Sequence, residues 1–264
     1  ALAQDKTGKY LPIAGKALIE LGDLAREWDD LEKAEKLIQE GIALSQKWSQ
    51  LSAFSGYLNL AQLYMAEGND PGVENALQAM WKIARQFDLV DVDDQIVEMI
   101  KIRFDLKRGN LEGIRRWAKE HELLAAAPEA KDVQIGSDAR VRMRKYEYPI
   151  LARIYLADGH PDKALEILNP LVPLLENLDR PILLVEIEIL RALAYQAAGE
   201  TISAMKSFEH ALTLAQPIGL VRTFLDEENM EGLLRAACRH LKDPSLLAYR
   251  SEEHTSELQS RITI

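Results

Sequence analysis

The chain of 264 residues carries 42 acidic against 32 basic side chains, a formal net charge of −10. This excess argues against direct contact with nucleic acid, because binding phosphates needs a surplus of Lys and Arg on one face. Hydrophobic residues make up 47% of the sequence, yet no apolar run approaches the roughly 20 residues that span a bilayer. The lone Cys238 excludes an internal disulfide framework and a multi-thiolate metal site, and it fits a reducing cytoplasm.

The first predicted element is a helical hairpin over about residues 9–48, with its turn at Asp29 and Asp30. Apolar residues recur mostly at helical spacing through its second half, from Leu31 to Leu44. Either aspartate can cap the second helix, because a carboxylate there accepts a hydrogen bond from the free backbone N–H groups of the first turn.

The second hairpin, over about residues 50–87, contains the first full copy of an eight-residue pattern, Ala-x-x-Tyr-x-x-x-Gly. Steps of three and seven residues return to one face of a helix, so Ala and Tyr share a stripe and Gly falls where the helix must stop. Asp70 and Pro71 then predict a cap and the first turn of the partner helix.

This pattern recurs along the chain, and we expect its residues to be structural, with the tyrosines packing between helices. The full copies are Ala61, Tyr64 and Gly68; Ala152, Tyr155 and Gly159; and Ala192, Tyr195 and Gly199. Altered residues keep the same register in the first hairpin, at Gly22, Ala25 and Asp29. We also expect all four tryptophans, Trp28, Trp48, Trp81 and Trp117, to pack between helices.

The third hairpin, over about residues 92–124, is the weakest copy, since Ile102 and Asp105 replace Ala and Tyr and only Gly109 keeps the stop. Gly109 and Gly159 are 50 residues apart, whereas 41 and 40 residues separate the neighbouring turn glycines. The excess predicts a loop around residues 125–138. Such an insert is either a plain surface loop or a functional one.

The fourth hairpin covers about residues 140–178, and Pro161 is expected in the first turn of its second helix. Kinks or breaks are expected at three further prolines, each of which removes a backbone donor from a helical stretch. These are Pro149, Pro170 and Pro173.

The fifth hairpin, over about residues 181–216, opens at Pro181 and turns at Gly199. In its second helix one stripe is expected to pack inward, formed by Ala204, Phe208, Ala211 and Leu212. A short closing helix is predicted over about residues 230–241.

A helical hairpin of this kind cannot bury its apolar face alone, and stacking on neighbours solves that problem. We therefore predict an all-α fold, an α-solenoid of antiparallel helix pairs in a tetratricopeptide-like superhelix, as one repeat domain over residues 1–245. Residues 250–264 break the pattern, and residues 250–260 read as an in-frame translation of an adapter oligonucleotide used in DNA sequencing. We expect this tail to be non-native, and we expect a fragment of a longer protein because the chain starts at Ala1 without an initiator Met.

The repeat length near forty and the closing residues 219–227, Gly-Leu-Val-Arg-Thr-Phe-Leu-Asp-Glu, resemble the tetratricopeptide-like sensor region of MalT-type regulators in the LuxR family. Residues 21–25 and 192–200 also look like that family, although Glu228 stands where the family usually has Gly. The resemblance covers about residues 9–245. It implies a signal-gated transcription activator with an ATPase domain before this region and a helix-turn-helix DNA reader after it.

The most site-like group is a basic and aromatic cluster beside the long insert. Arg140 and Arg144 are four residues apart on one helix face, and Tyr148 extends the same stripe. Guanidinium fork donors and ring stacking would suit an anionic or sugar-like ligand. The alternative is a solvated helix face paired with acidic neighbours.

Patterns for catalysis, cofactors and metals are incomplete. Gly15-Lys16 fails as a phosphate loop because Ala17 follows it and no Gly precedes it at the required distance. His121-Glu122 lacks the second His that a zinc-protease helix needs three residues further on. We therefore expect no enzyme activity, no metal site and no cofactor in this fragment.

The resulting hypothesis is the signal-sensing and oligomerisation segment of a MalT-type regulator. We expect it to be cytoplasmic and non-enzymatic, to bind a small-molecule inducer or a partner protein, and to self-associate without contacting nucleic acid or membrane. The alternative is a stand-alone tetratricopeptide adaptor that holds a peptide or protein in a concave groove. An upstream phosphate loop and a downstream helix-turn-helix in the flanking reading frame would favour the first hypothesis.

Overall fold

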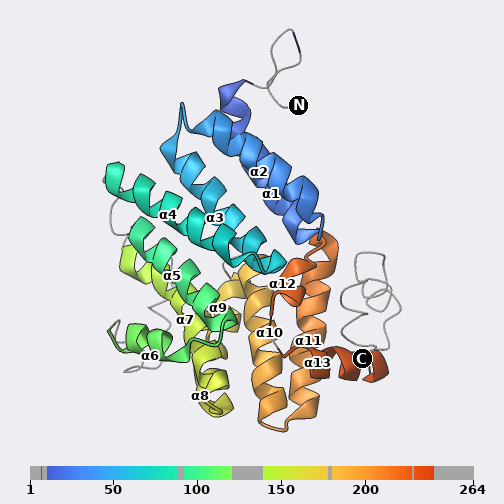
Figure 1. Ribbon diagram of the computed structural model, residues 1–264. Coiled ribbons are helices and arrows are strands. Elements are labelled where there is room, and N and C mark those ends of the chain that lie inside the picture. The colour runs from blue at the N-terminus through green and yellow to red at the C-terminus, as the bar shows by residue number, and fades with distance from the viewer. Residues whose placement is uncertain are drawn as a thin grey trace. The chain divides into compact units, whose positions relative to one another are not determined.

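A computed structural model describes residue 7 and residues 11–87, 92–120, 139–177, 180–227 and 229–240 (Figure 1). Side chains at positions 12, 92–95, 139–146 and 238–240 lie outside this description, as do the predicted loop at 125–138 and the predicted tail at 250–264. The elements in chain order are η1 Pro12–Ala14, α1 Gly15–Glu27, α2 Leu31–Ser45, α3 Gln50–Glu67, α4 Asp70–Gln86, α5 Val92–Lys107, α6 Leu111–Glu120, α7 Ala139–Ala157, α8 Pro161–Leu168, α9 Leu171–Asn177, α10 Pro181–Ala197, α11 Thr201–Ala215, η3 Gln216–Ile218, α12 Arg222–Leu225 and α13 Glu231–His240.

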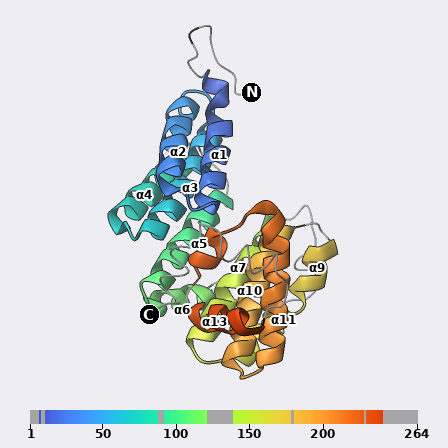
Figure 2. The same ribbon diagram turned by 90° about the vertical axis from the view of Figure 1, so that its right-hand side faces the viewer.

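Every regular element in these residues is helical, and successive helices pack as antiparallel pairs, so the predicted all-α fold is confirmed. The chain divides within α5, between Phe104 and Asp105, into two compact units. Unit 1 contains the pairs α1/α2 and α3/α4, drawn blue to cyan in Figure 1. Unit 2 contains α6 to α13, drawn green to red in Figure 2. The prediction of one repeat domain over residues 1–245 stays a prediction.

The turns between paired helices share one hydrogen-bonded geometry. Each contains a residue in the left-handed region, with φ between 64° and 80°, at Asp29, Gly68, Gly109, Gly159 and Gly199. The N–H of the next residue donates to a carbonyl oxygen five positions back, at 2.8–2.9 Å, which closes the helix end. In the weak copies this carbonyl belongs to Ala25 and Asp105, so their predicted register is confirmed.

The starts of α2 and α4 show which residue caps each helix. Asp30 caps α2, because its carboxylate accepts a hydrogen bond from the N–H of Lys33 at 3.4 Å, while Asp29 forms the left-handed turn. On α4 the cap is Asn69 and not Asp70, since the Asn69 side chain accepts from the N–H of Gly72 at 3.0 Å. The helix begins one residue earlier than expected, so Asp70 lies in its first turn.

The internal prolines have different effects. The predicted break at Pro170 is confirmed, because α8 ends at Leu168 and α9 begins at Leu171. The predicted break at Pro173 is wrong. Because the chain already breaks at Pro170, Pro173 lies in the first turn of α9, where a missing N–H loses no helical bond. Pro149 lies inside α7, which continues through it as one helix.

The core of unit 1 depends on close contact between helix backbones. A Cβ added at Gly15 would lie 2.4 Å from Oγ of Ser45 and 2.8 Å from the carbonyl oxygen of Gly41, so α1 and α2 are in close contact at this point. A Cβ on Gly56 of α3 would lie 2.4 Å from Ile42 of α2. Glycine at these positions therefore sets the distance between neighbouring helices.

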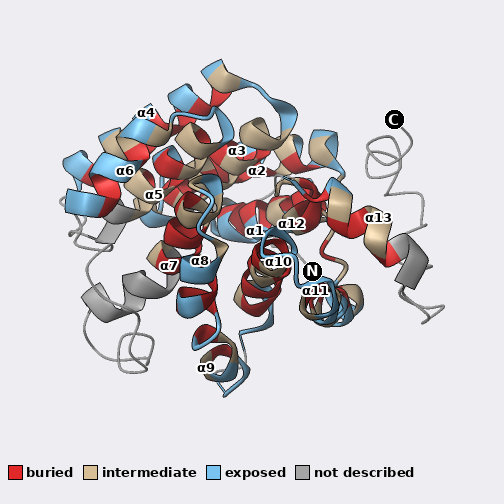
Figure 3. Cartoon of the chain, turned by 90° about the horizontal axis from the view of Figure 1, so that it is seen from below, coloured by how far each residue is buried: buried red, intermediate tan, exposed pale blue. Residues whose placement is uncertain are grey.

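The core of unit 2 forms around α10, and buried residues occur along most of the length of this helix (Figure 3). The predicted inward stripe of α11 is confirmed, since Ala204, Phe208, Ala211 and Leu212 are all buried. Phe224 of α12 packs edge-on against Phe208, with ring centroids 6.0 Å apart and planes at 83°. The closing residues 221–227 therefore cover the last helix pair of this unit.

Two of the pattern tyrosines, Tyr64 and Tyr195, connect their helix pair to the pair before it. The hydroxyl of Tyr64 donates to Glu35 of α2 at 2.8 Å, and an added Cβ on Gly72 would meet the Tyr64 ring at 2.7 Å. Burial, followed by this bond to Glu35, raises the pKa of Tyr64. The hydroxyl of Tyr195 donates to Asn169, which follows α8, at 3.4 Å. A structural role for this position agrees with these contacts.

Candidate ligand-binding site

The predicted Arg140, Arg144 and Tyr148 group lies on α7, and the structure describes the side chain of Tyr148 alone among the three. Tyr148 is only 2% exposed, so its ring contacts protein and is closed to ligand stacking. A stacking role for Tyr148 is therefore wrong. The side chains of Arg140 and Arg144 lie outside the described residues, so a ligand-binding role for these two stays a prediction.

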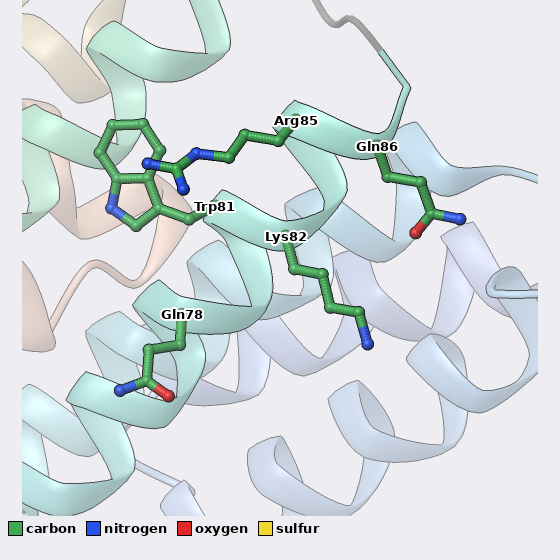
Figure 4. A pocket seen from close by; sticks show the side chains of 5 residues that line it. All are labelled: Gln78, Trp81, Lys82, Arg85 and Gln86. Carbon is green, nitrogen blue, oxygen red and sulfur yellow. The ribbon is translucent and has the colours of Figure 1, made fainter.

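A different surface of unit 1 is hollowed. The hollow has a volume of about 640 Å³ and is lined by one face of α4, with Gln78, Trp81, Lys82, Arg85 and Gln86 (Figure 4). Steps of three, one, three and one residue keep all five side chains on neighbouring turns. The sequence contains this spacing, but the five residues match no complete catalytic or metal-binding motif. The sequence pattern therefore gives no sign that they form a site.

The side chains around this hollow combine an aromatic ring with hydrogen-bond donors. Trp81 is half-buried and packs against the core of unit 1, so this contact holds its indole ring in place. The guanidinium carbon of Arg85 lies 5.6 Å from the centroid of the Trp81 ring, and Lys82 adds a second exposed cation. Exposed amides at Gln78 and Gln86 flank them. The group fits a small anionic ligand with a flat or sugar-like face.

The prediction that all four tryptophans pack between helices fails for two of them. Trp117 is buried and Trp81 packs partly against the core. Trp48, which lies between α2 and α3, is 74% exposed, and Trp28, at the end of α1, is 45% exposed. For these two the expectation is wrong, because apolar character alone does not tell an inward helix face from an outward one.

Unit 2 contains a buried polar cluster that serves its own packing. Glu188 of α10 is 1% exposed and accepts hydrogen bonds from Arg191 at 2.7 and 2.8 Å. Its carboxylate also lies 3.0 Å from Nδ1 of His210 on α11, and Arg191 donates to Asn169 at 2.9 Å. Both carboxylate oxygens are thus engaged within the protein, which leaves no open position for a substrate.

The described residues also bear on metal binding and on membrane insertion. Across these ranges, no cluster of three or more His, Cys, Asp or Glu side chains is arranged to hold a metal ion. Within the same part of the chain, none of the helices has both the length and the apolar character needed to cross a bilayer.

Comparison with models of protein families gives a match over most of the chain. The model of the family described as the MalT-like TPR region, where TPR stands for tetratricopeptide repeat, matches residues 1–240. A search of curated proteins found no match. The family match covers nearly the whole chain and includes all the helix pairs and the closing residues 221–227. This chain therefore belongs to the MalT-like tetratricopeptide family and forms the helical repeat region that defines it.

Proposed function

We propose that this chain is the signal-sensing and self-associating segment of a MalT-type transcription regulator. It carries no cofactor and no catalytic activity of its own, acts in the cytoplasm, and binds a small-molecule inducer or a partner protein. The family match over residues 1–240 supports the regulator assignment. The hollow on α4 supports the ligand-binding part, and it is the observation on which that part rests.

The chemistry of the α4 hollow favours a particular ligand class. Arg85 and Lys82 provide positive charge, while the fixed indole of Trp81 offers a flat apolar surface beside it. Sugars expose flat C–H faces that pack on such rings, and an attached phosphate or carboxylate is held by cationic donors. We therefore propose a phosphorylated or acidic sugar as the inducer class.

Titration calorimetry of the whole chain with glucose 6-phosphate and with glucuronate tests this part. We expect binding of at least one probe, and at least tenfold weaker binding in both Trp81→Ala and Arg85→Gln, because each removes one half of the ring-and-cation pair. Trp48→Ala is the matched control, since Trp48 is 74% exposed and lies outside the hollow, and it should bind like the parent chain. No binding of either probe, or equal binding by all variants, would overturn the ligand assignment.

The regulator assignment has its own test, which does not depend on the ligand. The reading frame on both sides of this stretch is sequenced in an independently prepared library. A phosphate loop upstream and a helix-turn-helix downstream are the expected result. Stop codons or an unrelated neighbouring domain would instead establish the stand-alone adaptor.

A further inference from the structure

The indole ring of Trp81 is covered by a side chain of its own helix. The guanidinium carbon of Arg85, one turn further along α4, lies over this ring, 5.6 Å from its centroid (Figure 4). Trp81 packs against the core of unit 1, whereas Arg85 is exposed, so the guanidinium lies on the outward side of the ring. A ligand that packs on the outward face of the indole therefore meets Arg85 first.

A second stack of a cation on a ring shows how Arg85 differs. Arg191 lies 5.7 Å from the centroid of the Tyr195 ring, but its N–H groups donate to Glu188 at 2.7 and 2.8 Å and to Asn169 at 2.9 Å. Among the residues that the structure describes, none forms a hydrogen bond or an ion pair with the guanidinium of Arg85. Toward these residues the donors of Arg85 are therefore open to an anion, while the ring holds the group in place.

We propose that Arg85 makes the α4 hollow select acidic over neutral ligands, because it covers the Trp81 ring until an anionic group draws its guanidinium aside. Since it concerns the same hollow, this role rests on the proposed function. A sugar that packs on the indole must displace the guanidinium and so loses the attraction between cation and ring. An acid group on that sugar replaces this attraction with charge-assisted hydrogen bonds, whereas a neutral group offers only weaker ones.

Lys82 provides a second positive charge in the hollow without covering the ring. It is exposed, and Figure 4 shows its side chain extending away from Trp81. Removing its charge weakens the attraction for an anion but leaves the guanidinium on the indole. Arg85 and Lys82 therefore allow the effect of charge and the effect of the cover to be measured separately.

Titration calorimetry with matched acidic and neutral sugars tests the selection. The pairs are glucuronate with glucuronamide, which has the same ring but no charge, and glucose 6-phosphate with glucose. In Arg85→Gln the acidic sugars should bind at least about tenfold more weakly, because their charged partner is lost. The neutral sugars should instead bind about two- to fivefold more tightly, because they no longer have to displace a cation from the ring.

Two further variants serve as controls for this change in opposite directions. Lys82→Gln should weaken the binding of acidic sugars without tightening the binding of neutral ones, since the ring stays covered. Trp81→Ala should weaken the binding of both kinds, since it removes the surface on which each of them packs.

Quenching of tryptophan fluorescence by acrylamide tests the cover without any ligand. In a chain carrying Trp28→Phe and Trp48→Phe, the remaining indoles are those of Trp81 and the buried Trp117. Arg85→Gln should raise the quenching constant of this chain, because it uncovers the Trp81 ring. Lys82→Gln should leave the quenching constant unchanged.

The possible outcomes separate this role of Arg85 from the ligand assignment. Acidic sugars that bind the parent chain, together with equal weakening of acidic and neutral sugars in Arg85→Gln, would overturn the selection and leave the proposed ligand class in place. An unchanged quenching constant in Arg85→Gln would overturn the cover. No binding of any of the four sugars to the parent chain would refute the ligand class and the selection together.

Discussion

At the scale of single residues, the most consequential group is an ionic cluster in unit 2. Arg153 of α7 donates from Nη2 to Glu227, at 2.5 Å, and to Glu186 of α10, at 2.9 Å, and all three side chains are largely shielded from water. Burial disfavours the charged guanidinium, but the carboxylates of Glu227 and Glu186 outweigh this and raise the pKa of Arg153. One arginine thereby joins two helices to the last residue of the closing segment.

Arg153→Ala should lower the free energy of unfolding by about 3 kcal/mol, because it leaves two carboxylates facing each other without a counter-charge. Urea denaturation followed by circular dichroism measures the change. Arg116→Ala is the control, since Arg116 lies 3.9 Å from Glu112 with both side chains mostly exposed, and a change below about 0.5 kcal/mol is expected there. Equal effects of the two substitutions would show that the buried cluster contributes no more than a surface pair.

This cluster also marks a limit of prediction from sequence. The partners of Arg153 are 33 and 74 residues away along the chain, and nothing in the local pattern around residue 153 sets it apart from a surface arginine. By contrast, the turn glycines are predictable, because the need for a positive φ and the end of an apolar stripe are both local signals. The same reason explains why Trp81 and Arg85 are missed as a site, since their significance comes from the hollow that they line.

At the scale of elements, the distance between α1 and α2 depends on paired glycines. A Cβ at position 41 would lie 2.7 Å from the carbonyl oxygen of Gly15 and 2.9 Å from the backbone nitrogen of Ile19. Backbone atoms of a packed helix cannot move aside as a side chain can, so the two helices would have to separate.

Gly41→Ala should therefore lower the free energy of unfolding by about 1–2 kcal/mol, because the strain of overpacking exceeds the helix propensity that alanine adds. Gly113→Ala on α6 provides the opposite case. Its added Cβ would meet nothing closer than 3.6 Å, so only the gain in helix propensity remains and stability should rise by up to about 1 kcal/mol. Thermal and urea unfolding of both variants test the difference in sign. Destabilisation by both would show that close backbone contact is not the deciding factor.

The elements also show which kinds of prediction succeed. The pairing of helices, the turns and the break at Pro170 follow from local chemistry and are confirmed. The cap at Asn69 is not foreseen, because it depends on the residue at which the helix begins. A kink at Pro149 stays a prediction, since α7 continues through that residue. Tertiary packing likewise decides which face of α1 is covered, and the exposure of Trp28 is therefore not predictable from the local sequence.

At the scale of the whole molecule, the two ends of the described chain differ. The last pair, α10/α11, is covered by α12 and α13, with Phe224 against Phe208 and Glu227 against Arg153. In the first pair, Leu21, Leu24 and Trp28 are 42%, 44% and 45% exposed. A repeat array needs a covered end to stay soluble, so residues 219–240 are expected to act as a cap.

Two truncations compare this cap with the predicted adapter tail. Ending the chain after Tyr249 should leave the unfolding temperature unchanged, because residues 250–264 lack the apolar periodicity that packing requires. Ending it after Gly219 should lower that temperature by about 5 °C or more, since Phe224, Leu225 and the partner of Arg153 are lost. Differential scanning calorimetry of the three chains gives the answer, and a stabilising contribution from residues 250–264 would contradict a non-native origin.

The hydroxyls of Tyr64 and Tyr195 each form a hydrogen bond across the junction between two helix pairs. Each ring is carried by one helix pair, while its oxygen is held by a polar group of the pair before it. Rotation of one pair against the other lengthens this bond, which contributes about 1 kcal/mol, so the bond adds a modest preference for one angle at the junction. At these two junctions the angle between neighbouring pairs is therefore set by a side-chain bond as well as by apolar packing.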